Sequence, residues 1–343
     1  MRGNVLFFST NSLNATFSSE IEKLGYGVTV FHNEKIIYPE VKNFSFIDKL
    51  KNIYYRIIKK DTSFPHKKQK KIFNNWVINR LESIIKEGER YEAIIFFRGD
   101  LYEREVLLKC KRLSHRMVSF QADGISVSQR ILEYRDIFDD VFCFDPDDAI
   151  KYNFKFLTNC ILFTDVKEKT TERDVFYLGT STYEREESVM KLENLFVKNN
   201  ISFKAILNIN KYKEEKTVNS IEHTYRFFDY CKVLEYEKKS KCILDLVHTN
   251  HNGLSFRFFE AMEMQKKIIT NNVEVKKYDF YNKNNIFIIG LDDEKTLFYF
   301  INSPYEKLDE DMILKYRLEN WLNIVLDTEN KIEIENPLDD EKI

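Results

Sequence analysis

Glycine, proline and cysteine are scarce in this chain of 343 residues, which has only 9 Gly, 5 Pro and 5 Cys. Collagen-like chains and Gly/Ser linkers need far more glycine, so both are excluded. The cysteines are odd in number, widely spaced and without a C-x-x-C pair. This spacing favours free thiols in a reducing compartment over a disulfide or zinc framework. They are Cys110, Cys143, Cys160, Cys231 and Cys242.

Long hydrophobic runs and an excess of charge are also missing. No stretch approaches the ~18 apolar residues of a membrane span, and the run at 5–8 is too short for the core of a signal peptide. The 53 basic and 55 acidic residues nearly cancel, so no global field draws the molecule onto nucleic acid. We expect a bacterial-type cytoplasmic protein without an anchor inside the bilayer and without a nucleic-acid partner.

What is present indicates two α/β domains. The chain is longer than one typical core of ~100–200 residues, and apolar runs alternate with helical patterns in each half. This alternation predicts mostly parallel sheets covered on both faces. The expected strands are 4–9, 28–31, 91–97, 116–120 and 141–144 in the first half, and 175–178, 203–207, 242–247, 268–269 and 286–289 in the second.

The polar segment 164–173 lacks hydrophobic periodicity and is the expected linker. We therefore predict an N-terminal domain at 1–165, a C-terminal domain at 166–326 and an acidic tail at 327–343. The pattern at 305–326 predicts one helix with an apolar stripe. Ligands of such sheets bind beyond the carboxyl ends of the strands, so the expected site lies between the domains.

The most informative stretch is 242–272, CILDLVHTNHNGLSFRFFEAMEMQKKIITNN. A buried strand leads through a polar loop to Gly253 and the first turn of a helix, whose unpaired N–H groups favour a phosphate. Gly253, Arg257 and Glu260 have i, i+4, i+7 spacing and share one helix face. The cation suits a diphosphate and the carboxylate suits ribose hydroxyls, which indicates a sugar-nucleotide site. An ordinary ion pair between Arg257 and Glu260 beside a turn glycine is the alternative.

This stretch resembles the donor-binding segment of GT-B glycosyltransferases, especially the group-1-like enzymes of bacterial lipopolysaccharide and capsule synthesis. The matching pattern is a strand, G-L-S-x-R-x-x-E-A, and K-K-I-I-T-N. The resemblance implies an α/β fold of two Rossmann-like domains facing each other across a cleft, and it assigns Glu260 to the donor ribose. Asn252 replaces the first acid of the family's E-x7-E signature, which leaves the stereochemical outcome open. The donor residues expected here are His251, Asn252, Gly253, Leu254, Ser255, Arg257, Glu260 and Asn271.

Two further segments are similar to the same family and lie in the expected order. The stretch 120–150 has an Asp after one strand and a Phe-Asp pair after the next, while 174–186 resembles the strand and phosphate-side loop that open the C-terminal domain. A capped helix start with a solvated Arg is the alternative for that loop. The residues expected to contact the diphosphate there are Gly179, Thr180, Ser181 and Arg185.

Glycosyl transfer needs an oriented acceptor hydroxyl and, if the configuration inverts, a base within ~2.6–3.2 Å of it. Asp123, on the loop after a central strand, is the leading candidate and Asp100 is the second; a helix cap is the alternative for each. Acceptor contacts are assigned to Ser9, Asn11 and Arg98, although the glycine-rich first loop usual in the family is missing. The resemblance implies no metal and no cofactor beyond the nucleotide-sugar substrate.

Two metal interpretations are weaker than their alternatives. Asp145, Asp147 and Asp148 resemble a D-x-D metal motif, but an Asp followed by proline and by further acids predicts a helix N-cap. His248 and His251 have no Cys or carboxylate at the spacing that a zinc site requires. We expect these histidines to line the donor loop or to face solvent.

The segment 42–71 is strongly basic, and its apolar residues follow helical spacing. One interpretation is a helix packed on its own sheet with a solvated basic face. The other is a basic amphipathic helix on an anionic membrane surface, which suits a lipid-linked acceptor. The apolar residues are Phe46, Ile47, Leu50, Ile53, Tyr54, Ile57 and Ile58.

The sequence thus predicts a glycosyltransferase that moves a sugar from a nucleotide sugar to a saccharide or lipid-linked acceptor of a bacterial surface polysaccharide. It would work in the cytoplasm, peripherally at the inner face of the plasma membrane. One alternative is a sugar-nucleotide 2-epimerase of the same fold, which would convert a nucleotide sugar without an acceptor. Another is a non-catalytic protein that binds a sugar nucleotide or a polymer.

Overall fold

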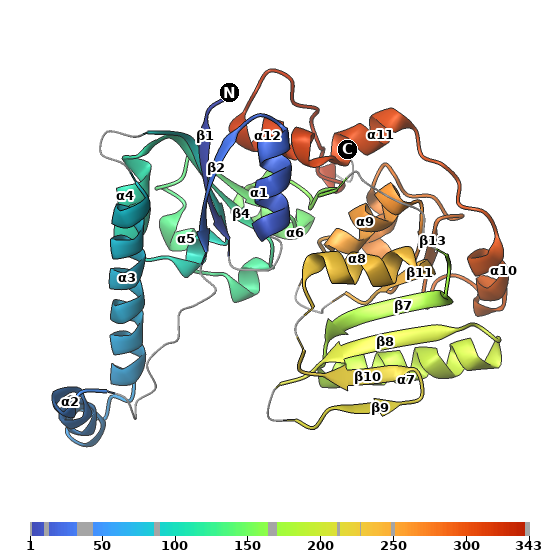
Figure 1. Cartoon of the computed structure of the whole chain (residues 1–343), viewed down its shortest axis with the longest axis horizontal. Coiled ribbons are helices and arrows are strands. Elements are labelled where there is room, and N and C mark those ends of the chain that lie inside the picture. Colours follow the sequence, from blue (N-terminus) through green and yellow to red (C-terminus); the bar gives the residue numbers. More distant parts are fainter. Residues whose placement is uncertain are drawn as a thin grey trace.

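The computed structural model describes residues 2–9, 14–32, 44–85, 90–163, 170–210, 213–226, 228–247 and 251–339. These residues form two α/β domains, each built around one sheet (Figure 1). The predicted linker lies largely outside the described residues, so the boundary between 165 and 166 stays a prediction.

The N-terminal sheet is parallel, with its strands in the order β2-β1-β3-β4-β5-β6. Alternate residues of a strand point to opposite faces, so Phe7 packs into one core, while Leu6 and Phe8 pack into the core on the other face. The strands are β1 (Asn4–Ser9), β2 (Gly27–His32), β3 (Tyr91–Phe97), β4 (Ser114–Gln121), β5 (Asp140–Cys143) and β6 (Lys155–Phe156).

Helices cover both faces of this sheet. Phe17 of α1 lies in the same core as Phe7, whereas Val77 of α3 and Leu107 of α4 lie in the core that contains Phe8. The helices of this domain are α1 (Asn14–Lys23), α2 (Phe46–Ile57), α3 (Phe64–Ile84), α4 (Arg104–Lys111), α5 (Ile131–Tyr134) and α6 (Pro146–Tyr152), with short 3-10 helices η2 (Gly99–Leu101) and η3 (Ile125–Val127).

The C-terminal sheet has the strand order β13-β12-β11-β7-β8-β10-β9, in which only β9 is antiparallel to its neighbour. Its strands are β7 (Arg173–Thr180), β8 (Phe203–Asn208), β9 (Lys216–Val218), β10 (Ile221–Thr224), β11 (Ser240–Asp245), β12 (Lys267–Thr270) and β13 (Ile286–Ile288). Its helices are α7 (Tyr183–Lys198), α8 (Tyr230–Lys238), α9 (Phe256–Met264) and α10 (Leu297–Asn302), with 3-10 helices η4 (Val273–Lys277) and η5 (Glu294–Thr296).

The end of the chain differs from the prediction of one helix at 305–326. Two short helices are present, α11 (Glu310–Tyr316) and α12 (Leu318–Leu326), separated by Arg317 in an extended conformation. The break has a clear cause: the Ile161 N–H donates to the carbonyl of Tyr316 at 2.8 Å, and the Leu318 N–H donates to the carbonyl of Ile161 at 3.0 Å. A continuous helix would use these backbone groups internally.

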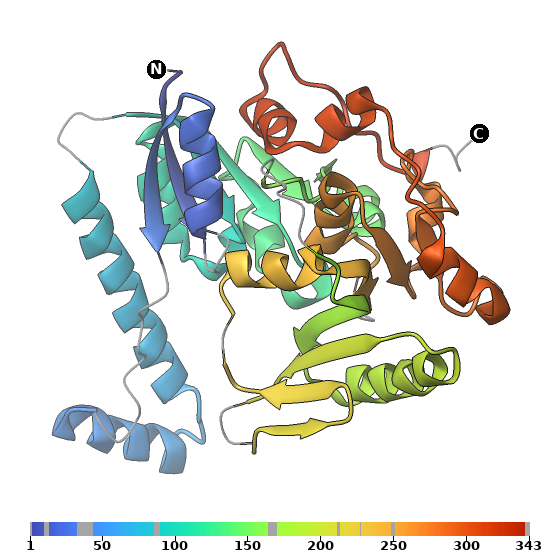
Figure 2. The same ribbon diagram turned by 45° about the vertical axis from the view of Figure 1, so that its right-hand side comes forward.

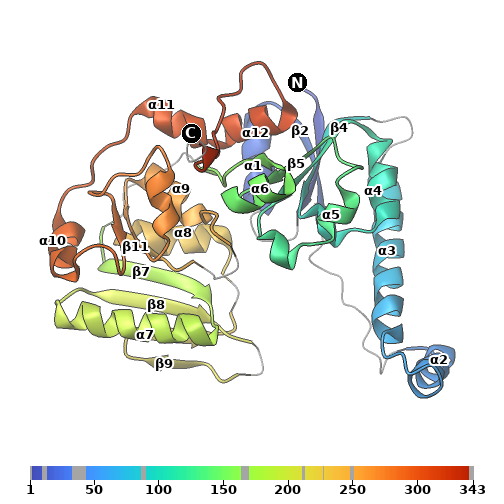
Figure 3. The same ribbon diagram turned by 180° about the vertical axis from the view of Figure 1, so that it is seen from behind.

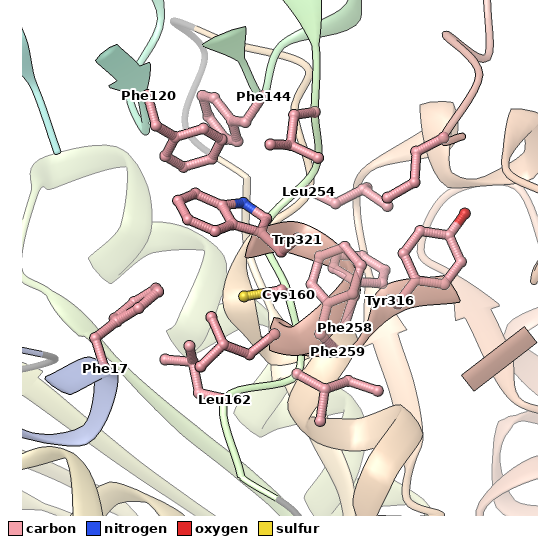
Figure 4. Close-up of a cluster of buried hydrophobic side chains, with 14 of the residues drawn as sticks. Phe17, Phe120, Phe144, Cys160, Leu162, Leu254, Phe258, Phe259, Tyr316 and Trp321 are labelled. Atoms are coloured by element: carbon pink, nitrogen blue, oxygen red, sulfur yellow. The ribbon is translucent and has the colours of Figure 1, made fainter. Parts of the chain in front are cut away.

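The helix α12 lies beside α1 over the N-terminal sheet, although its sequence position had assigned it to the C-terminal domain (Figure 2). Its Trp321 is 1% exposed and sits among aromatic residues of the N-terminal domain, including Phe17 and Phe120 (Figure 4). The same apolar cluster continues into Leu254 and Phe258 of the C-terminal domain. One core therefore joins the two domains.

Of the two interpretations of the basic segment, packing on its own sheet does not describe α2. This helix lies across the far end of α3, away from both sheets (Figures 1 and 3), and none of its residues is buried. None of the helices in the described ranges combines the length and the apolar character that crossing a bilayer requires.

Candidate functional site

The predicted donor segment leaves β11 at Asp245 and enters α9 through Ser255. Ser255 stands at the N-cap position, yet its hydroxyl donates to Asp245 Oδ1 at 2.7 Å and makes no cap bond to the helix. The start of α9 therefore keeps unpaired backbone donors, to which the helix dipole adds partial positive charge. Such a helix end suits a phosphate group.

Arg257 is fixed between the two central strands of the C-terminal sheet. Its Nη1 donates to Asp245 Oδ1 at 3.3 Å, and its Nη2 donates to the Leu178 carbonyl in β7. The guanidinium also lies 5.8 Å from the centre of the Tyr177 ring. Its ion-pair partner is thus Asp245 and not Glu260, so the ordinary i, i+3 pair that offered an alternative explanation is not formed.

Glu260 is 4% exposed and faces a second acid, Glu237 of α8, which is 1% exposed. Burial raises the pKa of Glu260, an effect that Tyr230 and Arg257 partly offset. Burial also raises the pKa of Glu237 well above its usual value, and the charge on Glu260 raises it further. Two carboxyl groups so close in a dry site share one charge, so we expect Glu237 to hold the proton and Glu260 to remain an acceptor for hydroxyl groups.

The second set of expected donor residues lies at the end of β7, in the loop after it and in the first turn of α7. Gly179 lies where a Cβ would collide with the Tyr177 hydroxyl. Thr182 caps α7 by accepting from the Arg185 N–H at 3.3 Å, and Arg185 Nη1 lies 3.5 Å from the Thr180 carbonyl. The capped helix start is therefore present, and contact of this loop with a diphosphate stays a prediction.

The donor loop is docked on the N-terminal domain at the end of β5. Asp145 Oδ2 accepts from the Asn252 N–H at 2.6 Å, and Asp147 Oδ2 accepts from the Asn252 side-chain amide at 2.7 Å. A Cβ at Gly253 would lie 2.6 Å from the Phe144 ring and 2.7 Å from its carbonyl oxygen. Gly253 is thus required because the two domains approach each other closely here. The sequence analysis had explained this glycine by the approach of a ligand instead.

The neighbouring predicted residues serve the same junction. The His251 ring lies 5.0 Å from that of Phe144, and burial lowers the pKa of His251, so we expect the imidazole to be neutral at pH 7. The buried Leu254 accepts through its carbonyl from Asn159 Nδ2 at 2.9 Å. Asn271 accepts through Oδ1 from a backbone N–H just beyond β11 at 2.8 Å and so braces the end of that strand.

The two candidate catalytic acids share one arginine. Arg98 adopts a left-handed backbone conformation, with φ 69°, and donates from Nε and Nη2 to both Asp100 oxygens at 2.7 and 2.8 Å. Its Nη1 donates to Asp123. Asp100 is buried with both oxygens engaged, while the Asp123 side chain is 52% exposed. Of the two, Asp123 is the acid whose side chain is accessible to solvent.

Asp123 is also close enough to the donor loop for its charge to act on His251. The structure therefore brings a candidate base of the N-terminal domain and the donor segment of the C-terminal domain to one place. Of the predicted acceptor residues, Asn11 lies outside the described residues and only the backbone of Ser9 is described. His248, expected at the donor loop, also lies outside the described residues. Arg98 is occupied by its two acids.

The D-x-D stretch is a helix N-cap, as predicted. Asp145 Oδ1 accepts from the N–H groups of Asp147 and Asp148 at 3.0 and 3.1 Å. Asp148 in turn accepts from the Ile125 N–H at 2.6 Å. Nowhere in the described part of the chain do three His, Cys, Asp or Glu side chains gather as metal ligands.

No family model matches the chain, and no curated protein matches its sequence. Among solved structures, the apo form of the lipopolysaccharide outer core galactosyltransferase WaaB is similar, with 13% identity, a TM-score of 0.50 and coverage of 94% of this chain and 99% of that chain. The fold is GT-B. This confirms the predicted class, two Rossmann-like domains facing each other.

Two other solved structures show lower similarity. An α-glucosyltransferase in complex with UDP and a 13-mer DNA has 10% identity and a TM-score of 0.48, covering 94% of this chain and 99% of that one. A UDP-N-acetylglucosamine 2-epimerase has 9% identity and a TM-score of 0.46, covering 97% and 99%.

Three residues of this site escaped the sequence analysis. Asp245 is the last residue of an apolar strand, and an acid at such a strand end could have indicated a site residue. Its carboxylate accepts hydrogen bonds from both Ser255 and Arg257. Glu237 lies in a charged helix whose pattern does not distinguish it from its solvated neighbours. Tyr177 stands in the continuous apolar run of β7, so the sequence does not distinguish it from ordinary core.

Proposed function

We propose that this protein is a glycosyltransferase that binds a nucleoside diphosphate sugar at the start of α9. The observation that carries the proposal is the uncapped end of α9, with Arg257 in the first turn of this helix and the buried Glu260 in its second turn. The helix end and the guanidinium would stabilise the leaving diphosphate. Glu260 would accept hydrogen bonds from the ribose hydroxyls.

Asp123 would act as the base that takes the proton of the acceptor hydroxyl, held in place by Arg98. The start of α9 and the Arg257 guanidinium would supply the positive charge that stabilises the leaving diphosphate. We therefore propose transfer without a metal ion or other cofactor. The docking of Asn252 on Asp145 and Asp147 keeps the donor loop facing the domain that carries Asp123.

The acceptor in this proposal is a saccharide, free or lipid-linked, of a bacterial surface polysaccharide such as lipopolysaccharide or capsule. The match of the 242–272 stretch to the group-1-like pattern supports it, and the similar solved structure is a lipopolysaccharide outer core galactosyltransferase. The enzyme would act in the cytoplasm, where nucleotide sugars are made, at the inner face of the plasma membrane.

A panel of UDP-, GDP-, dTDP- and CMP-sugars tests the proposal. Incubation without an acceptor should give slow release of one nucleotide through donor hydrolysis, and addition of a lipid-linked or free oligosaccharide should increase it. Nuclear magnetic resonance of the products identifies the sugar. Conversion of the donor to its 2-epimer without any acceptor would replace the transferase with an epimerase, and binding without turnover would indicate a non-catalytic binding protein.

Glu260→Ala is expected to weaken donor binding by about tenfold to a hundredfold, because a hydrogen bond to a charged group contributes about 1.5–3 kcal/mol. Isothermal titration calorimetry with the nucleotide identified by the panel measures the change. Glu263→Ala is the matched control: it removes an acid of the same helix whose ion-pair partner among the described residues is Arg317, at 3.8 Å. Unchanged affinity in Glu260→Ala would exclude the ribose assignment.

A further inference from the structure

The helix α2 turns its apolar side away from the protein. Phe46, Leu50, Ile53 and Ile57 follow i, i+4, i+7, i+11 spacing and share one face, and their exposed fractions are 76%, 50%, 53% and 66%. Monomeric proteins rarely leave so many neighbouring large apolar side chains in water without a binding role. We call the full set the α2 apolar face: Phe46, Ile47, Leu50, Ile53, Tyr54, Ile57 and Ile58.

The opposite side of α2 is the one that contacts the protein. Asp48 Oδ2 lies 3.2 Å from Lys68 Nζ of α3, and the Tyr55 ring stacks on that of Phe64 with centroids 5.2 Å apart and planes inclined by 15°. Asp48 and Tyr55 lie on the helix side opposite to Leu50. These contacts fix the rotation of α2 about its axis with the α2 apolar face outward.

The region around the α2 apolar face is positive. Residues 44–71 contain nine Lys and Arg against two Asp, and both acids are already paired, Asp48 with Lys68 and Asp61 with Lys67. Hydrogen bonds from Ser63, together with the smaller effect of Lys67, lower the pKa of Asp61 to about 2. Lys67, Lys68 and Lys70 form ion pairs with Asp61, Asp48 and Glu103. The cations of this stretch for which no ion pair is found among the described residues are Lys49, Lys51, Arg56, Lys59, Lys60 and Lys71.

We propose that the α2 apolar face and these cations dock the protein on an anionic lipid bilayer, with α2 lying in the headgroup layer parallel to the surface. A helix of this kind gains from burial of its apolar side and from attraction to anionic lipids. A second copy of the chain would bring like charges together, which disfavours self-association through this face. The proposal does not rest on the transferase function, because lipid binding is measured without turnover.

The position of α2 determines which domain the bilayer would hold. The helix α3 carries α2 at one end, while Phe73, Val77 and Leu81 along its length are buried against the N-terminal sheet. Docking would therefore fix the N-terminal domain beside the lipid, with the C-terminal domain attached through the shared core. If the proposed function holds, this is the domain that must reach a lipid-linked acceptor.

Co-sedimentation of the full chain with vesicles tests the apolar part of the surface. Vesicles of equal parts phosphatidylglycerol and phosphatidylcholine should bind the protein, and Ile57→Asp should weaken binding by at least about tenfold. Val197→Asp is the matched control, since Val197 of α7 is 65% exposed against 66% for Ile57. Because Ile57 touches no core, circular dichroism should show unchanged folding in both variants.

Charge reversal tests the electrostatic part. The double variant Lys49→Glu, Arg56→Glu should lose about tenfold or more in affinity for the anionic vesicles, whereas Lys191→Glu, Lys198→Glu on α7 should not. Binding of the unaltered protein should fall with added salt and should be much weaker on pure phosphatidylcholine.

Three results would overturn the proposal. They are no binding of the unaltered chain to anionic vesicles, equal binding by Ile57→Asp and Val197→Asp, and a concentration-dependent dimer that Ile57→Asp dissociates while vesicles bind nothing. Analytical ultracentrifugation distinguishes the last, which would assign the α2 apolar face to a second copy of the chain. If the true partner of this face were an acidic protein, the unaltered chain would also fail to bind the vesicles, which is the first of these results.

Discussion

Asp123→Asn is expected to lower kcat for sugar transfer by about 10²–10⁴-fold, the usual contribution of a positioned acid or base. The amide cannot take the proton of an acceptor hydroxyl, but its oxygen can still accept from Arg98, so the loop should keep its position. Donor affinity should change little, because Arg257 and Glu260, the side chains expected to hold the donor, belong to the other domain. Initial rates at saturating donor and acceptor give kcat, and calorimetry with the nucleotide gives the affinity.

Asp136→Asn is the control for this experiment. Asp136 is also an exposed acid of the N-terminal domain that pairs with an arginine, Arg104, at 2.9 Å, but it ends no strand facing the donor loop. Its substitution should leave kcat unchanged. Full transfer activity in Asp123→Asn would show that the base is another group; Asp100 would then be tested next, although Arg98 occupies both of its oxygens.

The strands could be predicted because their signals are local. Continuous apolar runs such as those of β1, β3 and β11 report burial on both faces of a parallel sheet. The antiparallel strand β9 could not be found this way, since Lys216, Thr217 and Val218 are all exposed. The break at Arg317 depends on Ile161, a partner more than 150 residues away, and no local pattern reports such a contact.

The same difference between local signals and contacts of distant segments applies to the candidate site. Arg257 and Glu260 are predicted site residues because helical spacing and the family resemblance coincide on one short stretch. The pairing of Glu260 with Glu237 and the docking of Asn252 on Asp145 join separate elements, so the sequence alone does not report them. The outward rotation of α2 is similar: amphipathic spacing defines its two sides but not which of them faces the protein.

Trp321→Ala is expected to lower the free energy of unfolding by about 3–5 kcal/mol, the usual cost of emptying a large aromatic site. The Trp321 ring has centroid distances of 5.3 Å to Phe120, 6.0 Å to Phe17 and 6.2 Å to Phe97, which belong to β4, α1 and β3. Urea unfolding followed by far-ultraviolet circular dichroism measures the loss without relying on tryptophan fluorescence. Tyr299→Ala, which removes an aromatic ring that is 77% exposed, should change stability by no more than about 0.5 kcal/mol.

The size of this loss bears on how the domains cooperate. Because α12 comes from the end of the chain yet packs in the core on one face of the N-terminal sheet, that core is complete only when the chain has passed through the C-terminal domain. Trp321→Ala should therefore also loosen the junction that holds Gly253 against Phe144. Donor binding should weaken as a result, although Trp321 is not one of the residues expected to contact the donor. Loss of stability no greater than in Tyr299→Ala would mean that α12 does not pack on the N-terminal sheet in solution.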